Sequence, residues 1–209
     1  MTITIVSGRS MDDLLGLFKD FDTSRINWSG VHGLQMKFGS NAMIQSEKIS
    51  PVLPKIFKIK KELSGIVNKY PCYIFEDKGV SFALHYRKCP KESIRFLDSI
   101  KDHLKKYERD ESVEVLHMKK VIEVKPAGIN KGYAIEAVRS RSVKNNYSSI
   151  NICIGDDITD EYLFRANPGG INIKVGKEKS REVAAEYFLN GISEVYWFLD
   201  KILKRNRKP

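Results

Sequence analysis

A run of carboxylates follows a short apolar segment within residues 151–161. The segment before Gly155 is apolar, and the carboxylates of Asp156, Asp157 and Asp160 come after it. In open α/β sheets ligands bind at the carboxyl ends of strands, so these side chains are suitably placed to hold a hard cation such as Mg²⁺. Adjacent aspartates can equally cap a helix and complement its dipole. The run therefore predicts a magnesium site or a helix start.

Three further polar clusters lie at predicted strand ends or helix starts, namely Ser7–Arg9, Gly30–Gly33 and Asn130–Gly132. Ser7 offers a hydroxyl donor and Lys131 a cation at a helix start, where backbone amides favour phosphate oxygens. With Mg²⁺ at Asp156, they would hold a phosphoryl group and stabilise its charge during transfer. Each turn taken alone is also typical of an ordinary loop.

The hydrophobic pattern outlines the elements that must position these clusters. Apolar and β-branched runs predict strands over 2–6, 150–154 and 170–175. Helical periodicity predicts helices over 10–18 and 192–203. Strand, loop and helix units of this kind are typical of a doubly wound α/β core.

The middle of the chain has a different pattern. We expect a helix over 52–67, strands over 73–78 and 80–87, a helix over 91–107, and strands over 112–118 and 121–125. Such a compact α+β unit is expected as a lid inserted into a discontinuous core. The predicted domains are a core of residues 1–34 and 119–209 and a cap of residues 35–118.

Side chains alternate along the strand predicted over 80–87. One face carries Ser81, Ala83, His85 and Arg87, and the other carries Val80, Phe82, Leu84 and Tyr86. The first face is polar and could meet a polar ligand. A solvated face with Glu and Lys paired across strands, or a packed histidine, remains the alternative.

Composition limits the classes of function. With 209 residues, 42% of them hydrophobic, the chain can bury a core. No apolar run approaches the roughly 20 residues of a membrane span, so we expect a cytoplasmic protein without a membrane partner. The net charge of +10 is largely dispersed or near the C-terminus. No recognition motif or interleaved aromatic platform accompanies it, so we expect no nucleic-acid partner.

The three cysteines, Cys72, Cys89 and Cys153, are odd in number and far apart. They form no metal-ligand pair and no dense disulfide framework. We therefore expect buried or surface thiols.

Several motifs together resemble the trehalose-phosphatase family of the haloacid dehalogenase superfamily. In this order and spacing they are Val6–Arg9, Val31–Gly33, Glu76–Lys78, His85–Arg87, Glu123–Pro126, Asn130–Gly132 and Gly155–Glu161. The resemblance covers residues 3–203 and implies a Rossmann-like core with an α+β cap. It also implies Mg²⁺-dependent hydrolysis of trehalose 6-phosphate to trehalose and phosphate through an aspartyl-phosphate.

The resemblance also assigns roles to positions. Ser7 matches the hydroxyl that binds the phosphoryl group, Lys131 the lysine that neutralises it, and Asp156 the magnesium ligand. The positions that support these groups or lie near the substrate are Asp157 and Asp160 at the metal, Arg9, His32, Gly33 and Asn130 in the loops, and Glu76, Lys78 and Glu123 at the disaccharide.

The pattern departs from the family at its start. There the Ser-Gly-Arg turn follows a strand that carries a pair of aspartates, whereas Met1 lies only six residues before Ser7. We therefore expect the first strand of the core, with its nucleophile, to be missing. Asp20 and Asp22 have the spacing but follow an amphipathic helix, so we do not assign them this role.

Two functions remain open on this basis. The first is a phosphatase that is active when its first strand is present. The second is an inactive fragment, or a regulatory module that binds a small-molecule sugar phosphate, with association with a trehalose-6-phosphate synthase as a further expectation.

Overall fold

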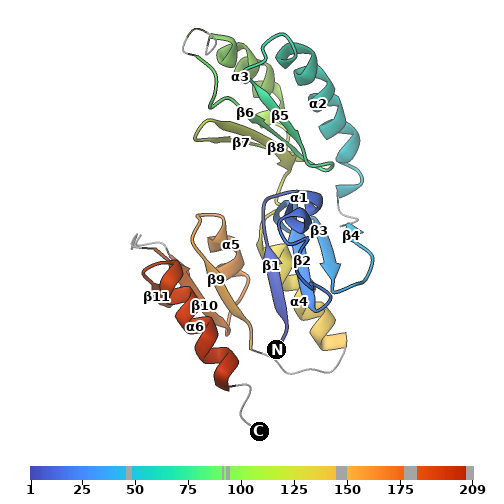
Figure 1. Ribbon diagram of the computed structural model, residues 1–209. Helices are drawn as coiled ribbons and strands as arrows, with labels where there is room; N and C mark the ends of the chain where they lie inside the picture. Colours follow the sequence, from blue (N-terminus) through green and yellow to red (C-terminus); the bar gives the residue numbers. More distant parts are fainter. Residues whose placement is uncertain (46–48, 91, 93–94, 145–149, 177–182, 206–209) are drawn as a thin grey trace. The chain divides into compact units, whose positions relative to one another are not determined.

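The computed structural model describes residues 1–45, 49–90, 92, 95–144, 150–176 and 183–205 (Figure 1). The chain divides into two compact units, residues 1–129 and 130–209. Helices and parallel strands occur in both units, so the predicted α/β class is confirmed. None of the described helices is long and apolar enough to cross a membrane.

A four-stranded sheet opens the first unit. Its order is β1 (Ile3–Val6), β2 (Ile26–Gly30), β3 (Gln35–Phe38), β4 (Ile44–Gln45). The first two strands run parallel and the others follow antiparallel. Helix α1 (Met11–Gly16) joins β1 to β2, and the Ser10 hydroxyl caps it by accepting a hydrogen bond from the Asp13 amide. Trp28 is fully buried against this helix.

A second, antiparallel sheet follows, here named the cap sheet. Its order is β5 (Ile74–Asp77), β6 (Phe82–His85), β8 (Val121–Pro126), β7 (Val113–Met118). Helices α2 (Leu53–Val67) and α3 (Arg95–Glu108) cover one face of it (Figure 1). The predicted order of helix, hairpin, helix, hairpin is therefore confirmed.

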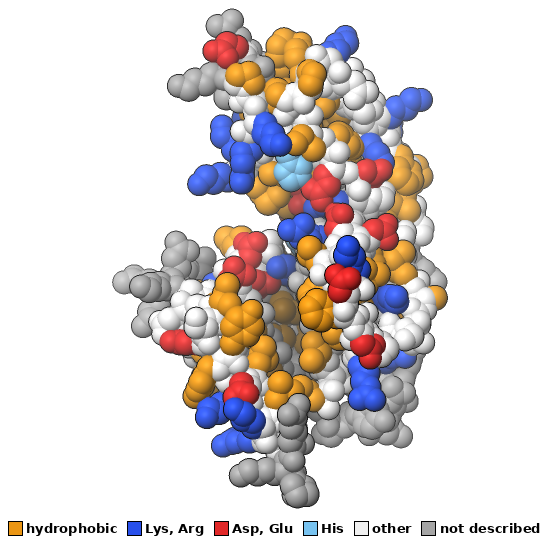
Figure 2. Space-filling model, viewed as in Figure 1, with side chains coloured by type: hydrophobic (Ala, Val, Ile, Leu, Met, Phe, Trp, Pro, Cys, Tyr) orange, Lys and Arg blue, Asp and Glu red, His pale blue; other side chains and the backbone are white. Residues whose placement is uncertain are grey.

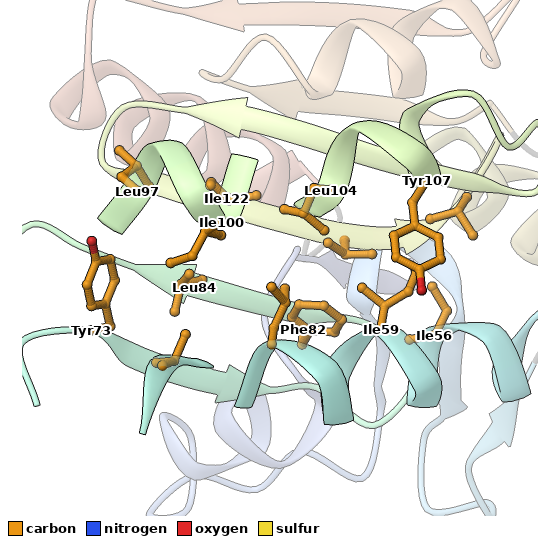
Figure 3. Packing of buried hydrophobic residues seen from close by; sticks show 14 residues of the cluster. Ile56, Ile59, Tyr73, Phe82, Leu84, Leu97, Ile100, Leu104, Tyr107 and Ile122 are labelled. Atoms are coloured by element: carbon orange, nitrogen blue, oxygen red, sulfur yellow. The ribbon is translucent and has the colours of Figure 1, made fainter. Parts of the chain in front are cut away.

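The core of the first unit lies between these two helices and the cap sheet (Figure 3). Phe82 and Leu84 from β6 and Ile122 and Val124 from β8 are buried in it. Full burial of one such side chain stabilises the fold by roughly 1.5–3 kcal/mol. Because strand side chains alternate, the residues between them must point to the opposite face, as the sequence pattern predicted. The face away from the two helices, here named the free face, carries Glu76, His85 and Glu123 beside apolar residues such as Ala83 and Leu116.

The second unit contains a parallel sheet of order β11 (Tyr187–Leu189), β10 (Ile171–Val175), β9 (Ile152–Gly155). Its helices are α4 (Gly132–Lys144), α5 (Asp160–Arg165) and α6 (Ile192–Arg205). The sequence outline contained neither α5 nor β11, because each is too short to give a clear period. Helix α5 begins at the last of the three aspartates, so the carboxylate run is also a helix start.

The predicted bounds of core and cap remain a prediction. Strand pairing joins β3 and β4 to the sheet of β1 and β2, although the predicted cap begins at residue 35. It joins β8 to the cap sheet, although the predicted core resumes at residue 119. Hydrogen-bonded pairing, which spacing alone does not give, determines the sheet to which a strand belongs.

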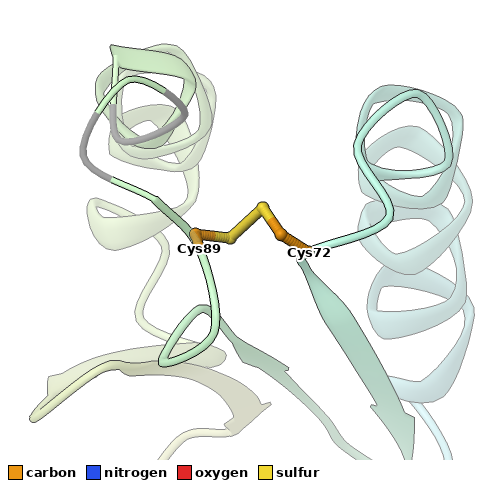
Figure 4. The surroundings of a disulfide bond; sticks show 2 residues. All are labelled: Cys72 and Cys89. Atoms are coloured by element: carbon orange, nitrogen blue, oxygen red, sulfur yellow. A yellow bond between two sulfur atoms is a disulfide. The ribbon is translucent and has the colours of Figure 1, made fainter.

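The prediction of three thiols is wrong for two of the cysteines. Cys72 and Cys89 form a disulfide with their Cα atoms 4.8 Å apart (Figure 4). The bond links the segment that follows α2 to the segment that precedes α3, at the open end of the β5–β6 hairpin. Cys153 is a free, buried thiol as expected, and burial raises the pKa of this thiol to about 11.

Candidate functional site

Two loops of the first unit are joined by backbone hydrogen bonds. The Val31 amide donates to the Arg9 carbonyl at 2.8 Å, and the His32 amide donates to the Ser7 carbonyl at 3.0 Å. The Arg9 amide in turn donates to the Ser7 hydroxyl oxygen at 3.1 Å. As an acceptor in that bond, the hydroxyl keeps its own O–H as a donor. The structure thus brings the predicted residues Ser7, Arg9, His32 and Gly33 into one double loop.

The second loop has an uncommon backbone conformation. Val31, His32 and Gly33 have φ angles of 47°, 56° and 100°, and Val31 is completely buried. A positive φ is a genuine outlier for a β-branched residue and persists only when the surroundings enforce it. A Cβ at Gly8 would lie 2.6 Å from two atoms of the His32 ring, so a larger residue there would displace the ring.

A row of alternating charges lies on the free face of the cap sheet. The Lys78 ammonium is 2.9 Å from a Glu123 oxygen and 4.0 Å from a Glu76 oxygen. The other Glu76 oxygen lies 2.6 Å from the His85 ring. Glu123 and Lys78 are buried, whereas Glu76 and His85 are partly exposed. The three residues predicted for sugar binding therefore lie together.

His32 connects this charged row to the double loop. Its Nε2 lies 3.8 Å from the second Glu123 oxygen, and its side chain is largely buried. Burial raises the pKa of Glu123, while the contacts with His32 and Lys78 lower it, with a net change from 4.5 to about 2. Glu123 is therefore ionised at neutral pH, and four of the predicted residues form one connected polar group.

In the second unit, Lys131 is paired with a carboxylate of the acidic run. Its ammonium lies 2.7 Å from Asp160 Oδ1, and both side chains are buried. Asp160 Oδ2 accepts a hydrogen bond from the Asp157 amide at 2.9 Å. A Cβ at Gly155 would overlap the Asp160 carboxylate, so a glycine is required at the end of β9. Asn130 Oδ1 accepts a hydrogen bond from the Gly132 amide at 2.9 Å, at the start of α4.

The acidic run offers hard oxygen ligands, but its three carboxylates differ. Among the described residues no group of three or more His, Cys, Asp and Glu side chains is arranged to hold a metal ion. Asp156 is exposed just after β9, and Asp157 Oδ1 accepts from the Ile158 amide at 2.6 Å. Both Asp160 oxygens are already hydrogen-bonded. Asp156 thus offers oxygen atoms of the kind that hard cations prefer, whereas Asp160 is engaged by Lys131 and the Asp157 amide.

Two residues beside these groups were not assigned from the sequence. Lys174, buried on β10, donates to the Asp157 carbonyl at 3.0 Å and lies 3.7 Å from Glu161. Lys125, two residues after Glu123 on β8, donates to the Ile129 carbonyl and pairs with Glu114 at 2.6 Å. A lysine inside a mostly apolar strand is the signal that could have found them.

Asp20 and Asp22 lie in the exposed loop between α1 and β2, away from any strand end. Asp22 Oδ1 accepts a hydrogen bond from the Ser24 amide at 3.0 Å, and this bond lowers the pKa of the carboxyl. Their position agrees with the prediction that they do not act as the nucleophile.

The chain is similar to known proteins over most of its length. The sequence profile of a family described as Trehalose-phosphatase matches residues 1–193. The chain belongs to the trehalose-phosphatase family. It is 29% identical over 203 residues to trehalose-6-phosphate phosphatase of Escherichia coli, covering 96% of this chain and 71% of that protein. It is 27% identical over 176 residues to a probable trehalose-phosphate phosphatase of Sinorhizobium fredii, covering 83% of this chain and 62% of that protein.

The chain also resembles a solved structure in its fold. The chain superposes on a trehalose-6-phosphate phosphatase related protein with a TM-score of 0.71 and 25% identity. The likeness covers 98% of this chain and 82% of that chain. It confirms the predicted α/β fold of the haloacid dehalogenase type. The family membership and the predicted resemblance agree.

Proposed function

We propose that this chain supplies the phosphate- and sugar-binding groups of a Mg²⁺-dependent phosphatase that hydrolyses trehalose 6-phosphate to trehalose and phosphate. The observation that carries the proposal is the connected group of His32, Glu123, Lys78 and Glu76, in a chain of the trehalose-phosphatase family. Carboxylates and an ammonium held in fixed positions suit the hydroxyl groups of a sugar.

The roles at the phosphoryl end follow from the chemistry of each side chain. The Ser7 O–H would donate to a phosphoryl oxygen, and the Lys131 ammonium would neutralise its charge. Asp160 holds that ammonium in place by an ion pair of 2.7 Å. Mg²⁺ bound at Asp156 would supply further stabilisation of negative charge during phosphoryl transfer. Positioning and electrostatics are the main contributions in this class of reaction.

Turnover also needs a nucleophile. Among the described residues no strand is followed by two aspartates two positions apart, so we propose that turnover depends on an additional strand carrying them. Strand β1 supports this idea, because among the described residues it pairs on one side alone, with β2. An edge strand presents unpaired N–H and C=O groups that another strand can use.

The test is phosphate release from trehalose 6-phosphate by this chain and by a chain extended at its N-terminus with the in-frame upstream sequence. We expect release by the extended chain with Mg²⁺, loss of release with EDTA, and strong impairment by Asp156→Asn. Asp20→Asn serves as a matched control that keeps activity. Release by the 209-residue chain itself would reject the additional strand, and no release by a folded, extended chain would reject the substrate.

The second candidate is a module that binds a sugar phosphate without turnover. It rests on the charged row of the cap sheet, because Lys78, Glu76 and Glu123 could bind a sugar whether or not a nucleophile is present. Calorimetric binding of trehalose 6-phosphate by both chains, with no phosphate released by either, would select this candidate.

The setting of the protein is a further part of the proposal. We expect a cytoplasmic location and association with a trehalose-6-phosphate synthase. Cell fractionation and co-purification with a tagged chain test these two expectations separately.

On the face shown in Figure 2, acidic and basic side chains are interspersed.

A further inference from the structure

The charged row on the cap sheet ends at a histidine to which the proposed function gives no role. His85 Nε2 lies 2.6 Å from Glu76 Oε2. In the register of the hairpin, His85 pairs with Ile74 and Glu76 pairs with Ala83. Glu76 and His85 are therefore diagonal neighbours on one face, close enough for long side chains to meet. Each Glu76 oxygen thus faces a different side chain, His85 or Lys78.

Exposure separates the two ends of this row. The Glu123 and Lys78 side chains are 4% and 8% exposed, whereas those of Glu76 and His85 are 30% and 36% exposed. Within this row a ligand can therefore reach the Glu76–His85 pair most easily. The Glu76 carboxylate is the acceptor at this accessible end, and His85 is its shortest contact.

Without His85, Glu76 would lose the closer of the two ion-pair contacts that it makes with described residues. Its remaining partner is 4.0 Å away and already binds Glu123 at 2.9 Å. The carboxylate would then be free to change rotamer, and binding would have to restrict it again. A fixed hydrogen-bond acceptor therefore depends on the imidazole.

We propose that His85 is a positioning residue for sugar recognition, which holds Glu76 as an acceptor for a hydroxyl group of the disaccharide. This inference rests on the proposed function. It adds to the charged row a residue whose own contact is with Glu76 and not with the reacting phosphate.

The structure provides a matched control in the same sheet. His117 on β7 lies 2.8 Å from Glu108, and the two side chains are 40% and 39% exposed. This pair has the same chemistry and nearly the same exposure as the Glu76–His85 pair. Neither residue takes part in the charged row.

The experiment is calorimetry of the 209-residue chain and its variants with trehalose 6-phosphate and with inorganic phosphate. We expect His85→Leu to weaken binding of the sugar phosphate about tenfold, in keeping with loss of a hydrogen bond to a charged group. His85→Gln, which keeps an N–H donor, should recover most of the affinity, and His117→Leu should bind as the unaltered chain does. For inorganic phosphate the change should stay below roughly twofold.

Three results would overturn the role of His85. They are unchanged binding by a folded His85→Leu variant, equal weakening for both ligands, and equal weakening by His117→Leu. Thermal unfolding of each variant shows whether it is folded. Absence of trehalose 6-phosphate binding by the folded, unaltered chain would instead reject the proposed function, and the role of His85 with it.

Discussion

The Lys78 ammonium lies 2.9 Å from the Glu123 carboxylate, and both side chains are buried in the cap sheet. Removing two charges from water is costly, and their attraction offsets that cost only while both are present. The stability of the fold should therefore fall more when one partner is removed than when both are replaced by apolar residues.

Lys78→Met should therefore lower the free energy of unfolding by about 3 kcal/mol, because it leaves Glu123 with a buried charge. The double variant Lys78→Met/Glu123→Leu should lose less than the sum of the two single changes. Urea unfolding at neutral pH measures both quantities. Lys105→Met removes one partner of an exposed pair and should leave the midpoint unchanged. Additive losses would show that the two side chains are not coupled.

The pKa of Glu123, lowered from 4.5 to about 2, predicts a pH dependence. A carboxyl with a lowered pKa stabilises the fold above its unfolded value, and this contribution is lost as the pH falls toward the folded value. The difference in unfolding free energy between the unaltered chain and Glu123→Gln should be about 3 kcal/mol at pH 7. It should shrink between pH 4.5 and about 2. A constant difference across this range would contradict the assignment.

The contact between Gly8 and His32 predicts the effect of one added methyl group. In Gly8→Ala the new Cβ would lie 2.6 Å from the His32 ring, so the ring must shift and its 3.8 Å contact with Glu123 is disturbed. We expect binding of trehalose 6-phosphate to weaken about tenfold. Gly65→Ala on α2 has open space around the added Cβ and should bind normally while slightly stabilising its helix. Equal affinities in the two variants would argue against a role for the His32 contact.

The disulfide predicts a stability that depends on redox conditions. Cys72 and Cys89 are 17 residues apart, and closing a loop of this length stabilises a protein by about 3 kcal/mol in the chain-entropy treatment. Cys72→Ser/Cys89→Ser should lose about that amount in urea unfolding without reductant. A reductant should bring the unaltered chain close to the variant and leave the variant unchanged. The reductant must be one that cleaves the disulfide. If the urea midpoint of the unaltered chain does not change with that reductant, the prediction is wrong.

Local sequence patterns were sufficient to predict which side chains of the 80–87 strand share a face of the cap sheet. Side chains of a strand alternate, so the sequence over 80–87 already determined that His85 and Phe82 point to opposite faces. The order of the polar motifs likewise determined the family and the fold class. The alternation of side chains and the order of the motifs can both be read directly from the amino-acid sequence.

Contacts between residues far apart in the sequence could be identified only in the tertiary structure. His32 and Glu123 meet at 3.8 Å although 90 residues separate them in the sequence. The diagonal contact of Glu76 with His85 and the bond between Cys72 and Cys89 both depend on the register of the β5–β6 hairpin. The spacing of two residues limits their separation but does not fix it. Strand pairing and packing fix it, because they determine which side chains face one another.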